Sequence, residues 1–263
     1  MKKLYPLALL VATGTMLVVS STSLRASETD ERIEASAKKS YVFKTYLKDD
    51  SIKTESKNGV VTLTGTVAED SHKSLAENTV ADLPGVISVD NRLKVKGENP
   101  AEHSDAWISM KVKSSLLFHR NVSATGTDVY VKDGIVSLRG EASSQAQKEL
   151  TTEYAKDIDN VKEVKNEMTI AQNPPQNSVQ RNEATSEKID DASITAQVKS
   201  ALLTHRSTSA LKTKVSTTDG VVSLSGIAKN DAEKSLVTKL VTDINGVTSV
   251  NNNMTIGTPT NKY

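Results

Sequence analysis

Three copies of one sequence, aligned without a gap, limit what this chain can fold into more than any other feature. The copies cover residues 30–94, 105–169 and 191–255, and the second and third copies are identical at about half of their positions. The strings NGVVTLTG, DGIVSLRG and DGVVSLSG recur at the same place in each copy and fix the register. A period of this length indicates a tandem array of one small module.

Each copy begins with the pattern of an amphipathic helix. In copy two, apolar side chains recur at Ile108, Val112 and Leu116, which is helical spacing. An aspartate follows each expected N-cap and suits the positive end of the helix dipole. The expected N-caps are Thr29, Ser104 and Asp190, and the expected helix ends lie near Lys44, His119 and His205.

A β-hairpin is predicted next in each copy. An alternating stretch leads into Asn-Gly or Asp-Gly, which accept the positive φ of a tight turn, and a β-branched run follows. Structural turns are therefore expected at Gly59, Gly134 and Gly220. A second set of glycines ends the second strand and predicts a close backbone approach or a bend there. This set is Gly65, Gly140 and Gly226.

A second helix and a final strand complete each copy. The helix is predicted to start near residues 70, 145 and 231, with Asn230 and Glu233 as a capping box. The strand–helix–strand crossover makes its two strands parallel, whereas the hairpin strands are antiparallel. The predicted fold class is therefore α+β, with three tandem α-β-β-α-β modules. Each module is expected to be a three-stranded mixed sheet with two helices on one face.

The segments between the copies set the expected domain organisation. The linker before copy three is polar and contains Pro174-Pro175, so copy three is expected to move independently. The expected divisions are a signal peptide (1–26), a first module (27–96), a connector (97–102), a second module (103–170), a flexible linker (171–188), a third module (189–257) and a tail (258–263).

The N-terminus has the pattern of a secretory signal peptide. Lys2 and Lys3 precede an apolar run from Leu4 to about Val19, and a Ser-rich stretch leads to Ala26. The run is short for a bilayer span, which needs about 20 residues. We therefore expect cleavage near Ala26 and a periplasmic product, the alternative being a retained membrane anchor. Cleavage leaves 30 basic and 32 acidic residues, which is close to neutral.

The residue inventory predicts a protein that is not an enzyme and that binds no metal or cofactor. Cys is absent, and no nucleophile elbow, phosphate-binding glycine loop or zinc-binding His-Glu-x-x-His string occurs. Near-neutral charge gives no reason to expect nucleic acid, and no motif indicates a small-molecule substrate. His119 and His205 are equivalent, and copy one has Lys44 there, so we interpret them as cations favourable to a helix C-terminus. The alternative for this pair is a metal or pH-sensing site.

The sequence resembles the BON domain family. The resemblance rests on the first helix DAWISMKVKSSLL, the hairpin DGIVSLRG and a closing Gly-Val or Asn-Val followed by Val and Asn. All three copies match, where two are usual. Without a lipidation cysteine, the chain is most similar to the soluble, hyperosmotically inducible periplasmic branch. The resemblance implies an α-β-β-α-β fold, an envelope location and a non-catalytic role in phospholipid binding, stress protection or chaperoning.

Trp107 is the strongest candidate for a contact residue. It is the only Trp, and its equivalents Arg32 and Ser193 predict a surface position. Trp suits a membrane interface, and the resemblance implies lipid contact by this helix of the second domain. The alternative is packing of Trp107 against a neighbouring module. The expected lipid- or partner-binding residues are Trp107, Met110, Lys111, Lys113 and Ser114.

Two partner classes follow from these expectations. The first is a phospholipid membrane surface, contacted during osmotic or envelope stress. The second is unfolded outer-membrane or secreted proteins, for which the chain would act as a holdase-type chaperone. A passive structural spacer is a third alternative. Because attraction to anionic lipid scales with basic residues near the surface, the near-neutral charge predicts weak, salt-sensitive lipid affinity.

Overall fold

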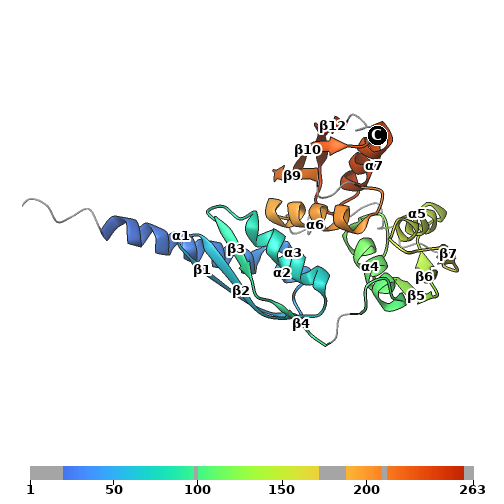
Figure 1. Cartoon of the computed structure of the whole chain (residues 1–263), viewed down its shortest axis with the longest axis horizontal. Coiled ribbons are helices and arrows are strands. Elements are labelled where there is room, and N and C mark those ends of the chain that lie inside the picture. Colours follow the sequence, from blue (N-terminus) through green and yellow to red (C-terminus); the bar gives the residue numbers. More distant parts are fainter. Residues whose placement is uncertain (1–19, 98–99, 172–187, 209–211, 258–263) are drawn as a thin grey trace, which may run out of the picture.

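Three modules with the same order of elements follow one another in the computed structural model (Figure 1). The structure describes residues 20–97, 100–171, 188–208 and 212–257. Most of the expected signal peptide, nearly all of the expected linker and the tail lie outside the described residues.

The element bounds show the repeat directly. Module one comprises α1 (Ser20–Lys39), α2 (Tyr41–Thr45), β1 (Ser51–Lys57), β2 (Val60–Val67), α3 (Asp70–Ala81), β3 (Ser88–Asn91) and β4 (Lys94–Val95). Module two comprises α4 (Asp105–Phe118), β5 (Thr127–Lys132), β6 (Ile135–Ala142), α5 (Gln145–Lys156), β7 (Glu163–Asn166) and β8 (Thr169–Ile170). Module three comprises α6 (Asp191–Thr204), β9 (Thr213–Thr218), β10 (Val221–Ala228), α7 (Asp231–Thr242), β11 (Ser249–Asn252) and β12 (Thr255–Ile256).

Each sheet is built around the second strand of the hairpin. In module one, β2 pairs antiparallel with β1 on one side and parallel with β3 and β4 on the other. Strands β6 and β10 take the same central place in their sheets. Alternate residues of β2, such as Val61 and Leu63, are buried beneath the helices of their module. The expected α+β class and the mixed sheet of each module are confirmed.

The hairpin turn is held by the aspartate that opens the first helix. Asp191 accepts hydrogen bonds from the backbone N–H groups of Asp219 and Gly220, at 2.8 Å each. Asp30 and Asp105 bind the equivalent turns in the same way. The bonds from the turn lower the pKa of Asp105 below its usual value. Both central residues of each turn have positive φ, as Asn-Gly and Asp-Gly predict.

The glycine of the second hairpin strand lies inside the strand rather than at its end. At Gly140, φ is +118°, and a Cβ would lie 2.1 Å from the Gly126 carbonyl oxygen. Gly65 and Gly226 repeat this geometry in β2 and β10. The chains approach too closely here for any side chain, as expected, but the strand continues for two more residues.

An asparagine divides the final strand into two pieces. The Asn252 side-chain amide donates to the Lys234 carbonyl (3.0 Å) and to Thr238 Oγ1 (2.8 Å) on α7. Its Oδ1 accepts from the Met254 N–H group at 3.0 Å. Asn91 and Asn166 make equivalent bonds in their modules. The final strand is thereby fixed to the second helix of its own module.

Module one departs from the prediction at its first helix. Helix α1 begins at Ser20, so Thr29 lies within the helix and is not its N-cap. The helix also stops at Lys39, and Ser40, with ψ of 148°, turns the chain into the short helix α2. Ser104 and Asp190 cap α4 and α6 as predicted, each accepting from the N–H group three residues on.

The third module packs against module one, in contrast to the independent unit expected from the preceding linker. One face of α6 is buried against α2 and α3, and Ser193, Ala196 and Gln197 on that face are inaccessible to solvent. Ser193 Oγ accepts from the Val42 N–H group at 3.1 Å, and the Tyr46 hydroxyl donates to Gln197 Oε1 at 3.1 Å. A single hydrophobic core therefore runs through modules one and three.

Candidate functional site

The expected contact residues lie along α4, the first helix of module two. Trp107, Met110 and Lys111 are half-buried, and Lys113 is exposed. The Trp107 ring meets the His103 ring edge-on, with 5.3 Å between centroids, and Lys111 Nζ lies 5.4 Å from the Trp107 centroid. Four of the five residues thus keep surface in contact with solvent.

The fifth residue, Ser114, is buried against module one. Its side chain lies close to two residues at the start of α3. Ser114 Oγ donates to Glu69 Oε1 at 3.3 Å and is 3.4 Å from Ser71 Oγ. Ser193 is also buried, between modules one and three, so the reasoning that it marks a surface position is wrong. Trp107 itself packs partly on the core of its own module.

The equivalent histidines His119 and His205 meet at the junction of modules two and three. Both side chains are fully buried, and their Nε2 atoms are 3.3 Å apart. The Tyr154 ring stacks on His119 with 3.9 Å between centroids. Burial lowers the pKa of His119, which the nearby Asp243 carboxylate offsets only in part. The interpretation of His119 as a helix-end cation is therefore wrong.

Hydrogen-bond distances restrict where the two imidazoles carry their protons. His205 Nδ1 is 2.9 Å from Asp157 Oδ2, and because an ionised carboxylate only accepts, Nδ1 carries the proton. Between His119 Nε2 and His205 Nε2, only one nitrogen can donate and the other must accept. His119 Nδ1 lies 3.4 Å from Asp243 Oδ2 and has no hydrogen bond with the described residues. Hydrogen bonds from His205 and Ser207 outweigh burial and lower the pKa of Asp157.

The junction has approximate two-fold symmetry. His119 forms an isolated antiparallel bridge with Ile244, and the equivalent His205 forms one with Ile158. The Arg120 N–H group donates to the Asp243 carbonyl at 2.9 Å, and the Arg206 N–H group donates to the Asp157 carbonyl at 3.0 Å. Because each module uses the same residues on the other, the contact resembles the isologous interface of a two-fold dimer.

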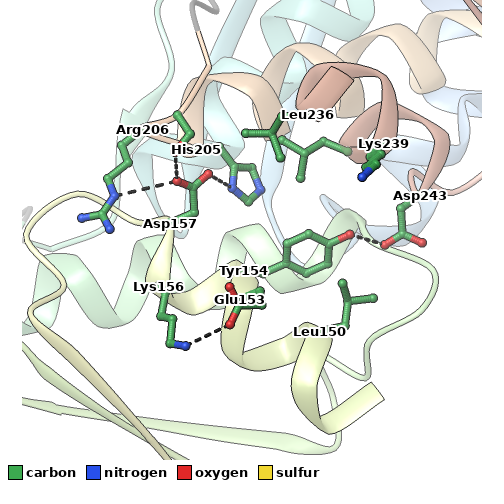
Figure 2. A pocket seen from close by; sticks show the side chains of 12 residues that line it. Leu150, Glu153, Tyr154, Lys156, Asp157, His205, Arg206, Leu236, Lys239 and Asp243 are labelled. Carbon is green, nitrogen blue, oxygen red and sulfur yellow. Dashed lines mark hydrogen bonds and ion pairs between the residues drawn. The ribbon is translucent and has the colours of Figure 1, made fainter. Parts of the chain in front are cut away.

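A cleft of about 610 Å³ lies beside the histidines, between α5 and α7 (Figure 2). Its apolar lining comes from equivalent positions of the two helices, Leu150 with Leu236 and Tyr154 with Leu240. Leu240 is buried in the core of module two, although it belongs to module three. The Tyr154 hydroxyl donates to Asp243 Oδ2 at 2.5 Å, and both residues line the cleft.

Charged side chains surround this apolar lining. Glu153 pairs with Lys156 at 2.9 Å, and the Arg206 guanidinium lies 3.8 Å from Asp157. Lys239 is exposed, and its ammonium makes no ion pair or hydrogen bond with the described residues. Sequence reasoning missed the cleft because it forms only where two copies meet. The available signal was the pair of leucines, Leu150 and Leu236, on the second helices.

Within the described residues, no group of three or more His, Asp or Glu side chains has the geometry of a metal site. Nor does any described helix have the length and hydropathy to cross a membrane.

Comparison with known proteins assigns the repeat. The BON domain profile matches residues 29–97, 104–172 and 190–258, which is most of the chain. The chain belongs to the BON domain family. In each of the three domains an aspartate holds the hairpin turn and an asparagine fixes the final strand. These contacts explain why both residues recur at the same place in every copy.

Two relatives were found among curated proteins. The osmotically-inducible protein Y of Escherichia coli is 31% identical over 57% of this chain and 71% of its own length. An uncharacterized protein in the gshII 5′ region of Anaplasma centrale is 29% identical over 56% of this chain and 90% of its own. Among solved structures, CdsD, a structural protein of the type III secretion system of Chlamydia trachomatis, is 17% identical over 86% of this chain and 91% of its own. Its TM-score of 0.23 is too low to support a conclusion.

Proposed function

We propose that this chain is a non-catalytic, periplasmic BON-repeat protein that contacts phospholipid surfaces of the envelope through α4. The proposed setting is osmotic stress, because the Escherichia coli relative is osmotically inducible by name. Export of the chain, with cleavage near Ala26, is part of this proposal. Residues 1–19, which include the apolar run, lie outside the described residues.

The solvent-facing part of α4 is the observation that carries the proposal. Trp107 and Met110 offer apolar surface there, and Lys111 and Lys113 add two ammonium groups within two helical turns. The Lys111 ammonium lies beside the Trp107 ring. A membrane that contacts this face would therefore meet an aromatic ring and a cation together at the level of its headgroups. The equivalent face of α6 is covered by module one. The equivalent positions of α1, Arg32, Ala35 and Ser36, are exposed but carry no large apolar side chain, so module two is the copy whose free face carries large apolar side chains.

Vesicle flotation tests this proposal. The chain from Ser27 onward should float with vesicles that contain phosphatidylglycerol, and less with pure phosphatidylcholine vesicles. Reversal of both charges in the Lys111→Glu/Lys113→Glu variant should abolish flotation, since each basic residue near an anionic surface contributes about 1 kcal/mol. Lys132→Glu/Lys165→Glu reverses two exposed lysines on β5 and β7 and is the matched control. Equal loss in the control and the α4 variant would contradict a specific role for α4.

A holdase-type chaperone is the second candidate function. Large apolar side chains are exposed in every module, including Ile87, Tyr130 and Ile227. Such positions give weak contacts to unfolded chains. Suppression of aggregation of an unfolded outer-membrane protein, with no flotation on any vesicle, would favour this candidate over lipid contact.

A further inference from the structure

We propose that the cleft between α5 and α7 binds one monomeric fatty-acid anion, with its alkyl chain on the leucines and its carboxylate at Lys239. This site lies apart from the lipid-contacting face proposed for α4 and does not depend on it. The sequence alone contains no motif for a small-molecule ligand, so this site was not expected from it.

The size and lining of the cleft fit a single alkyl chain. Its volume of about 610 Å³ lies within the range of roughly 300–1,000 Å³ typical of small-molecule sites. Leu150, Leu236 and Leu240 line it from both helices, and the Tyr154 ring adds an aromatic wall (Figure 2).

An alkyl chain suits the cleft better than a peptide segment does. The cleft is lined by side chains of two helices and of the turn that follows α6, and no strand edge borders it. A peptide entering the cleft would therefore bury backbone N–H and C=O groups without partners, which is costly. An alkyl chain has no such groups to satisfy.

Charge selects the head of the ligand. The two carboxylates near the histidines are occupied, because Asp157 accepts from His205 and Ser207, and Asp243 accepts from Tyr154. Glu153 is paired with Lys156. Lys239 takes the place that Glu153 has in α5, and its ammonium has no such partner among the described residues. The free ammonium at the rim therefore favours an anionic head, which a carboxylate supplies.

Isothermal titration calorimetry of the chain from Ser27 onward with dodecanoate, below its micelle threshold, tests the proposal. We expect one site per chain. Shortening the ligand to decanoate should weaken binding by up to about 15-fold, since each buried methylene contributes roughly fourfold in affinity. Dodecyltrimethylammonium, which has the same chain and a cationic head, should bind far more weakly.

Two lysine variants locate the carboxylate. Lys239→Ala should weaken dodecanoate binding on the order of tenfold, the effect of a charge-assisted contact. Lys132→Ala, at an exposed lysine of β5 that does not line the cleft, should leave binding unchanged. Lys111→Glu/Lys113→Glu should also leave it unchanged, which separates this site from the α4 surface.

Several results would overturn the proposal. These are no heat of binding with dodecanoate, equal affinity for the anionic and cationic dodecyl compounds, or equal effects of Lys239→Ala and Lys132→Ala. Capture of phosphatidylglycerol vesicles that depends on Lys239, in a protein that binds no dodecanoate, would identify the cleft as a membrane contact and would also overturn it.

Discussion

His119 and His205 face each other with 3.3 Å between their Nε2 atoms, at the centre of the junction between modules two and three. Only one proton fits between these two nitrogens. Protonation of both histidines would place two N–H groups face to face in a site without solvent, where like charges repel strongly. The junction therefore does not accommodate both histidines in the protonated form.

The free energy of unfolding should decrease as the pH is lowered, because of His119. Its pKa in the folded chain lies below the unfolded value of about 6.5, so the unfolded chain binds the proton first as pH falls. The contribution of His119 is fully present above pH 6.5 and is lost below it. The loss can reach about 1.4 kcal/mol per pH unit for one proton. Denaturant unfolding at pH 7.5, 6.5 and 5.5 measures this slope.

A histidine in solvent provides the control for that slope. His119→Gln should flatten the decline between pH 6.5 and 5.5, whereas His103→Gln should leave it unchanged, since the His103 side chain is 57% exposed. A decline of the same steepness in all three proteins would mean that other groups cause it.

Removal of the aspartate that holds the hairpin should destabilise its module. Asp191→Ala leaves the N–H groups of Asp219 and Gly220 without their acceptor and should cost about 1–3 kcal/mol. Asp128→Ala, at an exposed position of β5, is the control and should cost less than about 0.5 kcal/mol. The free energies of unfolding in urea give both values. Equal costs would show that the turn does not depend on Asp191.

The third module should stay attached after the linker is cut. A protease site inserted between Gln176 and Asn177 would sever the only covalent connection to module two. Because Ser193, Ala196 and Gln197 are buried against module one, the fragments should co-elute in gel filtration. Separate elution of the C-terminal fragment would show that the three modules do not form one body.

Much of the fold could be predicted because each position occurs three times in the sequence. The Asp-Gly pairs at Asp133 and Asp219 predict their turns, and a glycine common to all copies predicts the close approach at Gly140. The tertiary role of Asp105 was missed, because the helix dipole already accounts for an aspartate at that position. Because the helix N-terminus already explains Asp105, the sequence gives no sign that its carboxylate also binds the hairpin turn.

Contacts between the copies could not be predicted from the repeat. Alignment shows that His119 and His205 are equivalent, but it does not show that they touch. The presence of Lys44 in copy one favoured a solvent-facing cation, yet Lys44 belongs to the module outside this two-fold junction. For the same reason Ser193, a small polar residue typical of surfaces, gave no sign of its burial against module one.

Fluorescence of Trp107 tests the proposed lipid contact most directly, because it is the only Trp in the chain. We predict that phosphatidylglycerol vesicles shift its emission to the blue, that brominated acyl chains quench it, and that added salt weakens both effects. Trp107→Ser should reduce flotation. Vesicles that bind the protein without any change in Trp107 emission or any quenching would contradict the assignment of α4 as the membrane-contacting face.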